Sequence, residues 1–491
     1  MQRPLPLLVL ALLACDSTPE STRARIERGH VATVAASDAA PEDATATLDV
    51  GAAPDADGVS SGLDIPDTGP ADVTAEPDDA PSEDVAPTEV ITDADAAPEP
   101  DVEVIAPEPL GTFDDPHVVA RWPWVVAHST SDAVSDHLDR YGCAPAIGEA
   151  GPERVYRFEL DVPGRVVVEL DEADGVDVDL HLLAAAPSSD ATEADCLARA
   201  NTRLEQDLAA GVYWLVVDSY SSAAGEHGGD YRVAFERIVL DRWQVVEVAP
   251  GVTWRQKVYA SYAGGRQTIN VLAVDLSHPE VAVRPHLGAG CSRPSAVGPA
   301  VGAIAVINGG FFDTGPGTCP PLDLVKIDGE VESTNRLTGA AQRSFGVTAA
   351  GEPLMAWVDA GADWPEAHHA LGAYPSLVTD GAVRVEPDRD TSFFDSRHPR
   401  SALGLTADGV LLLVTVDGRT DAGVGMTMAA LAQHMVNLGA VDAVNLDGGG
   451  STAMWIRGQS LDGIVNFPSD DGDTDHEGER GVADLLTVVP R

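Results

Sequence analysis

Residues 398–456 read HPRSALGLTADGVLLLVTVDGRTDAGVGMTMAALAQHMVNLGAVDAVNLDGGGSTAMWI. Two apolar runs in this stretch, at 411–416 and 442–446, predict buried strands. Between the runs, apolar residues recur at the spacing of one helical face, at Met428, Leu431, Ala432 and Met435. Thr427 is expected to cap the start of that helix, and Gly439 to close its end.

Each predicted strand ends in an aspartate followed by glycine. Asp417 precedes Gly418, and Asp447 precedes three glycines. If the two strands are parallel in one sheet, a right-handed crossover brings both aspartates to the same edge, where open α/β sheets bind ligands. Either Asp-Gly pair alone is a common turn, but the repeat favours a functional site. The expected fold class is α/β (or α+β) with a mixed sheet.

A third strand end has the same form. The apolar run 303–307 is followed by Asn308-Gly309-Gly310-Phe311-Phe312-Asp313. Paired glycines let a ligand approach the main chain closely. Asparagine and aspartate can bind hydroxyl groups while an aromatic face packs on a sugar ring. The segment therefore favours a sugar site, with a tight turn and two core phenylalanines as the alternative.

Six motifs in order carry a family resemblance: INGGFFD, HPRSALG, TVDGRT, a helix ending in LGA, NLDGGGS and the pair Glu479-Arg480. Over about residues 245–491 the chain resembles the phosphodiester glycosidase family, which includes exopolysaccharide-related bacterial proteins. The resemblance implies an enzyme that hydrolyses a sugar-1-phosphodiester, with N-acetylglucosamine as one candidate sugar. The alternative is a glycan-binding protein that has kept the fold without the activity.

Such chemistry needs charge stabilisation at the phosphate and carboxyl groups near the anomeric carbon. Asp447 and Glu479 are the expected reacting pair, and Asp417 would orient Arg419 or bind a sugar hydroxyl. Their separation, which decides between retention and inversion, is left open. Three arginines have planar forks suited to phosphate oxygens, or form structural ion pairs: Arg400, Arg419 and Arg480. The remaining expected substrate-binding residues are Asn308, Gly309, Gly310, Asp313, Ser401, Gly448, Gly449 and Ser451.

The N-terminal region, residues 1–110, contributes −20 of the net charge of −49, with 24 acidic and 4 basic residues. Residues 1–15 form an expected signal peptide, too short to span a membrane, whose Cys15 follows a lipobox-like Leu-Leu-Ala and is the expected lipidation site. Residues 16–110 are an Ala-, Asp- and Pro-rich acidic linker, expected to be disordered. No cluster of lysines and arginines offsets these acidic residues, so a nucleic-acid partner is not expected. These features predict an exported, membrane-anchored lipoprotein at the bacterial cell surface or in the periplasm.

Residues 111–240 predict a separate accessory domain. Several strands alternate apolar and polar positions with turn residues between them, which indicates a β-sandwich similar to the prepeptidase C-terminal type. Asp174, Asp177 and Asp179 are a possible calcium site, although a solvated acidic edge is favoured and no metal is assigned. A second acidic stretch, 470–475, is likewise favoured as a solvated loop. Nothing in the sequence fixes the oligomeric state.

Four cysteines remain if Cys15 carries lipid, and they allow three pairings. Pairing within each domain, Cys143 with Cys196 and Cys291 with Cys319, is the simplest solution, and an oxidising compartment makes it plausible. The second bridge would steady the turn at Asn308–Asp313.

Overall fold

The computed structural model describes residues 108–188, 193–223, 225–315, 319–385 and 391–491. The described residues belong to one compact unit. The expected signal peptide, the lipidation site at Cys15 and most of the expected linker lie outside the described residues. Among the described residues, no helix is both long and apolar enough to cross a membrane.

Residues 108–240 form two β-sheets and contain no helix among their described residues. One sheet has the order β1 (His117–Val119), β4 (Glu153–Leu160), β10 (Gly211–Ser219), β6 (Val178–Leu183) and β8 (Ala198–Ala200). The other has the order β2 (Trp124–Ser129), β13 (Asp230–Ile238), β5 (Gly164–Glu172) and β9 (Arg203–Leu208). Alternate residues of both sheets, such as Phe158 and Phe235, share one core, as two packed sheets require. Strands are thus present where apolar–polar alternation predicts them.

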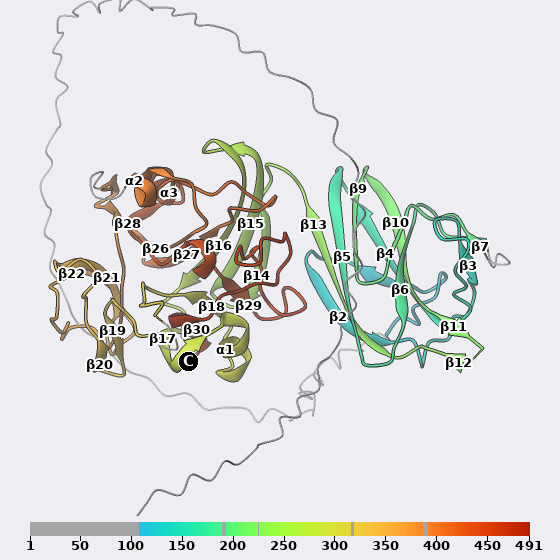
Figure 1. Cartoon of the computed structure of the whole chain (residues 1–491), viewed down its shortest axis with the longest axis horizontal. Helices are drawn as coiled ribbons and strands as arrows, with labels where there is room; N and C mark the ends of the chain where they lie inside the picture. Colours follow the sequence, from blue (N-terminus) through green and yellow to red (C-terminus); the bar gives the residue numbers. More distant parts are fainter. Residues whose placement is uncertain (1–107, 189–192, 224, 316–318, 386–390) are drawn as a thin grey trace, which may run out of the picture. The chain divides into compact units, whose positions relative to one another are not determined.

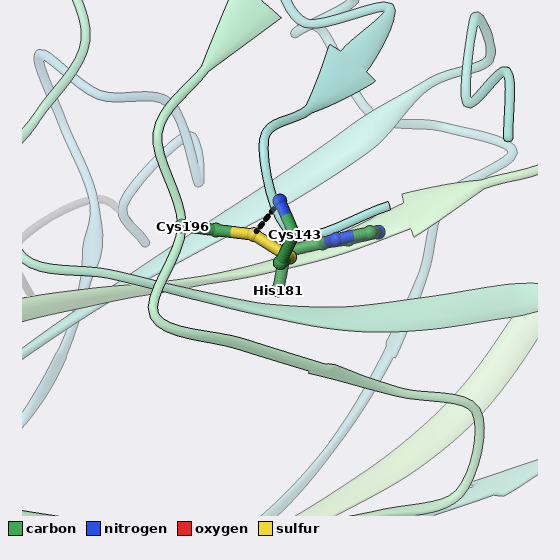
Figure 2. A group of neighbouring side chains, drawn as sticks. All are labelled: Cys143, His181 and Cys196. Atoms are coloured by element: carbon green, nitrogen blue, oxygen red, sulfur yellow. Dashed lines mark hydrogen bonds between the residues drawn. A yellow bond between two sulfur atoms is a disulfide. The ribbon is translucent and has the colours of Figure 1, made fainter. Parts of the chain in front are cut away.

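Two short ladders complete this part of the chain. They are β3 (Arg140–Tyr141) with β7 (Glu193–Ala194), and β11 (Ser221–Ser222) with β12 (Gly225–Glu226). Cys143, next to the first ladder, forms a disulfide with Cys196. This bridge lies beside the buried His181, and the backbone N–H of Cys143 faces Sγ of Cys196 at 3.1 Å (Figure 2).

An eight-stranded antiparallel sheet dominates the C-terminal part of the chain. Its order is β14 (Gln244–Ala249), β15 (Val252–Tyr262), β16 (Gly265–Asp275), β27 (Val410–Val416), β26 (Arg400–Thr406), β28 (Ala440–Asn445), β24 (Ser376–Thr379) and β25 (Ala382–Val383). Leu413 packs into the core on one face of this sheet, and Val414 into the core on the other. Burial on both faces explains the continuous apolar run 411–416.

Two smaller sheets share the first of those cores. One has the order β17 (Val281–Ser292), β30 (Val482–Pro490), β18 (Ala305–Asn308) and β29 (Met454–Ile456). The other has the order β20 (Glu330–Ser333), β19 (Val325–Ile327), β23 (His369–Gly372), β21 (Gln342–Val347) and β22 (Pro353–Val358). The expected Cys291–Cys319 disulfide is present, and it closes the loop that contains β18.

Helices are few. They are α1 (Pro294–Ala300), α2 (Thr391–Asp395), α3 (Met428–Asn437) and the 3-10 turn η1 (Gly449–Ser451). Helix α3 starts as expected, because Thr427 accepts a hydrogen bond from the N–H of Ala430, and Gly439 follows its end with a φ of 96°. Figure 1 shows α2 and α3 together beside β26 and β28.

The expected fold class needs correction in one respect. β27 and β28 do run in the same direction, but β26 lies between them and pairs with both in antiparallel register. Every ladder between the described strands from β14 to β30 is antiparallel. The described part of the chain is therefore β-rich rather than α/β with a mixed sheet, because the strands from β14 to β30 pair only in antiparallel ladders.

Candidate active site

The ends of β18 and β28 meet in the C-terminal part of the chain. The side-chain amide of Asn308, the last residue of β18, donates to the carbonyl of Asp447 at 2.7 Å. The N–H of Asp447, just beyond β28, donates to the carbonyl of Gly309 at 3.0 Å. Two of the sequence motifs, INGGFFD and NLDGGGS, are thus joined through their backbones, and Asp447 lies at the junction.

Two aspartates that the sequence argument did not single out support this junction. Asp484, in the middle of β30, accepts a hydrogen bond from the N–H of Gly310 at 2.8 Å. Asp323 accepts from the N–H of Phe311 at 2.7 Å and from the side chain of Gln342 at 2.8 Å. Both carboxyl groups are buried. A side chain at position 309 would collide with Asp484, so glycine is required there for close approach rather than for a turn alone.

Asp323, Asp447 and Asp484 form a carboxyl cluster. Burial raises the pKa of all three, that of Asp447 to about 6 and that of Asp484 to about 7. The charge of Asp323 raises the pKa of the other two further, while Ser451, the N–H of Gly448 and Arg480 lower that of Asp447. Interacting carboxyl groups titrate as a set, so the cluster can retain a proton near neutral pH. Asp447 is the only one of the three that is not fully buried.

An arginine lies against each of the three glycines that follow Asp447. A Cβ atom placed on Gly448 would lie 3.8 Å from Cδ of Arg400, and one on Gly449 would lie 3.1 Å from Nη2 of Arg419. A side chain on Gly450 would collide with Arg480. The structure therefore brings the three predicted arginines to the loop beside Asp447.

Arg400 is almost fully buried and its donors bind main-chain carbonyl groups. Nε donates to Met426 at 3.0 Å, and Nη2 donates to Phe393 at 2.7 Å and to Ser396 at 3.2 Å. Burial and the charge of Arg419 lower the pKa of Arg400 to about 10. Because no carboxylate pairs with it among the described residues, its positive charge remains uncompensated at this edge of the sheet.

Arg419 is exposed and is held by a histidine. Its Nη2 donates to Nδ1 of His398 at 2.9 Å, and Nε2 of His398 faces the carbonyl of Ser392 at 3.2 Å. Burial and the two neighbouring arginines lower the pKa of His398, so the ring is neutral and can accept at Nδ1. Arg419 has a φ of 65°, a strained conformation for a side chain of this size. Within the described parts of the chain it has no carboxylate partner, which leaves its guanidinium open to an anion.

Arg480 and Glu479 each have a polar partner outside the glycine loop. Arg480 makes a bidentate ion pair with Asp470, at 2.7 and 2.6 Å, so its charge is largely balanced. The carboxylate of Glu479 accepts from the N–H of Ser295 at 3.2 Å and from the Ser295 hydroxyl, at the first turn of α1. Among the described residues no hydrogen bond joins Asp447 to Glu479 or to Asp484, but the charge of Asp447 raises the pKa of Asp484 and not that of Glu479. Asp484 is therefore a further candidate for the carboxyl partner of Asp447.

The other expected site residues lie beneath the loops or away from them. Asp417 is fully buried, accepts from the N–H of Phe467 at 3.0 Å and has no hydrogen bond or ion pair with Arg419. Ser401 is buried and donates to Asn308 at 2.6 Å. Asp313 is exposed and accepts from the N–H of Gly315 at 3.0 Å, as a turn residue does. Burial raises the pKa of Asp417 to about 7.

Two groups of potential metal ligands outside this site do not fit an ion well. In one, the rings of His117 and His128 stack at 4.1 Å and nearly in parallel, beside Glu108. Their lone pairs lie in the ring planes, so two stacked rings cannot direct them at one ion. In the other, Nδ1 of His369 accepts from the N–H of Asp328, and Arg284 pairs with Asp328. Of the acidic residues considered for calcium, Asp179 pairs with Arg199 and Asp470 with Arg480.

Known proteins match this part of the chain. Residues 301–489 match the family model described as phosphodiester glycosidase. The SPbeta prophage-derived uncharacterized protein YomE of Bacillus subtilis (strain 168) is 33% identical over 112 residues, which are 23% of this chain and 16% of that protein. Mouse N-acetylglucosamine-1-phosphodiester alpha-N-acetylglucosaminidase is 26% identical over 178 residues, 33% of each chain. The chain thus spans a third or less of the length of these relatives.

One solved structure is similar at lower identity. The catalytic domain of the zebrafish N-acetylglucosamine-1-phosphodiester alpha-N-acetylglucosaminidase, auto-inhibited by its pro-peptide, is 21% identical, with a TM-score of 0.40, over 52% of this chain and 89% of that one. The match to the family model covers the ends of β18, β27 and β28, the carboxyl cluster and the three arginines. This part of the chain is therefore similar to the phosphodiester glycosidase family.

Proposed function

We propose that the C-terminal part of the chain hydrolyses a sugar-1-phosphodiester. One observation carries this proposal: Asp447, a partly buried carboxyl group with a raised pKa, lies at a glycine loop lined by two arginines that have no carboxylate partner in the described regions. A carboxyl group beside unbalanced positive charge is what a phosphodiester glycosidase needs, because the substrate combines an anomeric carbon with an anion.

The phosphodiester would bind first at Arg419. This guanidinium is exposed, and His398 fixes its orientation. A planar fork can hold two phosphate oxygens at once, while buried Arg400 adds positive potential without presenting its donors. The arginines would also stabilise the negative charge that the phosphate gains as it leaves.

Asp447 would act on the water or on the anomeric carbon itself. With a pKa of about 6 it is mostly ionised at pH 7, so it suits a base or a nucleophile better than an acid. Water adds its oxygen to the anomeric carbon, the bond from that carbon to the phosphate oxygen breaks, and a reducing sugar and a phosphate monoester leave. Asp484 and Asp323 would hold the turn and keep a proton within the cluster, with Glu479 as the weaker candidate for a second reacting carboxyl.

A cleft beside the site offers room for the rest of the substrate. It has a volume of about 790 Å³ and is lined by Trp357, Tyr374 and Arg343, among others. Two hydrogen bonds join Tyr374 to Asn445, which lies two residues before Asp447. The N–H of Tyr374 donates to the carbonyl of Asn445 at 3.0 Å, and the side-chain amide of Asn445 donates to the carbonyl of Tyr374 at 2.8 Å. Trp357 is 56% exposed. An exposed indole among hydroxyl and guanidinium groups suits a sugar chain.

Export and anchoring form a separate part of the proposal. Two disulfides are consistent with an oxidising compartment, and the N-terminal sequence suggests attachment through lipid on Cys15. The substrate would then be a cell-surface or extracellular glycan. In cells, Cys15→Ser should leave the protein uncleaved or in the soluble exported fraction, whereas a wild-type protein without lipid mass on Cys15 would refute the anchor.

The activity is tested with the purified protein and a soluble N-acetylglucosamine-1-phosphodiester. Release of a reducing sugar, lost in Asp447→Asn, supports the enzyme. Binding of the compound without release, unchanged in Asp447→Asn, would instead support the alternative of a glycan-binding protein. Phosphodiesters of other sugars, assayed in parallel, separate a wrong choice of sugar from a wrong reaction.

A further inference from the structure

A buried ion pair lies close to the candidate active site. His476 stacks on Phe467, with ring centroids 4.7 Å apart. Its Nδ1 lies 2.8 Å from the carbonyl of Asn466, and its Nε2 lies 3.5 Å from the carboxylate of Glu236 on β13. Both ring nitrogens face acceptors, so both must carry protons. Burial alone would lower the pKa of His476, but the hydrogen bond and charge of Glu236 raise it to about 10.

The segment that His476 holds supports two site loops at once. The side-chain amide of Asn466 donates to Asp417 at 3.3 Å and to the carbonyl of Thr452 at 3.1 Å, while its oxygen accepts from the N–H of Met454 at 2.8 Å. The N–H of Phe467 donates to Asp417 at 3.0 Å. Asp417 lies two residues before Arg419, and Thr452 lies two residues after Gly450. Asn466 and Phe467 therefore brace both the arginine loop and the glycine loop.

We propose that Glu236 and His476 are positioning residues of the active site. Their ion pair fixes Asn466 and Phe467, which in turn fix the loops that carry Arg419 and the glycines after Asp447. On this proposal, which rests on the proposed function, a strand of the N-terminal sheets contributes to phosphodiester binding although none of its residues touches substrate. A fragment that starts at residue 240 would lack Glu236, so it should not retain full activity. If residues 245–491 were self-sufficient, the same fragment would be fully active.

A matched control lies on the same strand. Arg232 of β13 donates to the carbonyl of Leu461 and pairs with Asp171, and no hydrogen bond joins Leu461 to either site loop among the described residues. Glu236→Gln removes the charge but keeps the size of the side chain, and Arg232→Gln removes the charge of an exposed side chain on the same strand whose hydrogen bond does not lead to the site. Both variants are made in the full chain, and thermal unfolding is measured for each. If the ion pair only stabilises the fold, the loss of activity should follow the loss of stability in the same way for the Glu236 variant and the Arg232 variant.

We expect Glu236→Gln to lower kcat/KM by about ten- to a hundredfold, because small misplacements of binding groups are costly, while Arg232→Gln stays within about twofold of wild type. The Glu236→Gln effect should shrink in an Arg419→Ala background, because the two changes act on one interaction. If Glu236→Gln does not fold, Glu236→Gln with His476→Gln, which leaves no buried charge unpaired, replaces it. Equal kcat/KM for Glu236→Gln and Arg232→Gln, or additive effects with Arg419→Ala, would overturn the proposal.

The test also works if the proposed reaction is wrong. Binding of inorganic phosphate, measured by calorimetry, then replaces turnover as the readout. Glu236→Gln should weaken phosphate binding and Arg232→Gln should not, whether or not any sugar phosphodiester is hydrolysed. If the wild-type protein does not hydrolyse the substrate, only the proposed function is contradicted. If the two variants bind phosphate with the same affinity, only the positioning role is contradicted.

Discussion

Gly310 donates its backbone N–H to the side chain of Asp484 at 2.8 Å, while the backbone of the same aspartate accepts from Gly309 at 2.9 Å. A single residue of β30 thus holds two successive amides of the turn that meets Asp447. A buried carboxyl group in an apolar strand is costly unless it is hydrogen-bonded. Its presence here indicates that the position of the turn matters more than the stability of the strand.

The pH dependence of stability tests this relationship. Burial raises the pKa of Asp484 from 3.8 to about 7 in the folded protein. Between these values the folded state binds more protons than the unfolded state, so the free energy of unfolding should fall as pH rises from about 4 to about 7. Asp484→Asn can still accept from Gly310 but cannot titrate. Over this pH range the unfolding free energy of Asp484→Asn should decline less than that of wild type, and the difference should be on the order of a few kcal/mol.

The measurement is thermal or denaturant unfolding of wild type and Asp484→Asn at closely spaced pH values. Asp313→Asn is the control, because Asp313 is an exposed turn residue and its loss should leave the pH profile unchanged. Some decline should remain in Asp484→Asn, because burial also raises the pKa of Asp417 and Asp447. Parallel profiles for wild type and Asp484→Asn would show that the carboxyl group of Asp484 titrates normally.

The local parts of the fold could be predicted from the sequence because their signals are local. The apolar run 411–416 and the helix from Thr427 to Gly439 correspond to β27 and α3. The direction of β27 relative to β28 was also predictable. The insertion of β26 between them was not, because strand order depends on contacts between distant segments. The expectation of a mixed α/β sheet failed for this reason.

The site residues show the same division. Asp447 and the three arginines lie in recognisable motifs, and the structure gathers them at one loop. Asp484 was missed because the segment Val482–Pro490 reads as an ordinary strand, although an aspartate within such an apolar run was an available signal. Glu479 was paired with Asp447 on motif order alone. Its partner Ser295 lies 184 residues away in the chain, a contact that no spacing rule reveals.

Two carboxyl variants distinguish the roles of Asp447 and Glu479. Asp447→Asn should lower kcat by at least about a hundredfold, the scale of a general acid–base contribution, with little change in the unfolding temperature. Wild-type activity should fall below about pH 6, because burial raises the pKa of Asp447 to about 6 and protonation removes the reactive form.

Glu479→Gln should lower kcat by less than about tenfold and should destabilise the fold, because its carboxylate holds Ser295 at α1. Steady-state kinetics on a sugar phosphodiester, with circular dichroism as a folding control, measure both variants. A Glu479→Gln loss as large as that of Asp447→Asn would restore Glu479 as a reacting group.

Trp357 provides a test of the cleft beside the site. Trp357→Ala should raise KM by about three- to tenfold for a substrate with an extended glycan, because ring contacts of this kind contribute about 0.5–1.5 kcal/mol. The kcat should not change, since the indole lies outside the reacting group. KM for a short phosphodiester and the unfolding temperature should stay near wild type because Trp357 is exposed. An equal rise in KM for short and long substrates would place the cleft outside the binding path.

Arg419 should show opposite effects on stability and on binding. Its φ of 65° is unfavourable for any residue with a side chain, whereas glycine adopts it without strain. Arg419→Gly should therefore raise the free energy of unfolding by about 0.5–1 kcal/mol. The same change removes the exposed guanidinium and should raise KM for a phosphodiester by at least about tenfold, the scale of a charge-assisted hydrogen bond.

Arg419→Lys separates the two effects, because lysine keeps the charge and the strain but loses the fork that binds two oxygens. It should weaken binding less than glycine does, and it should not stabilise the fold. His398→Gln extends the test, since it removes the ring that holds Arg419 at 2.9 Å and should raise KM without relieving the strain. Unfolding experiments and KM values for the three variants provide the comparison. A glycine variant that binds phosphodiester as well as wild type would remove Arg419 from the site and leave its strained backbone without an explanation.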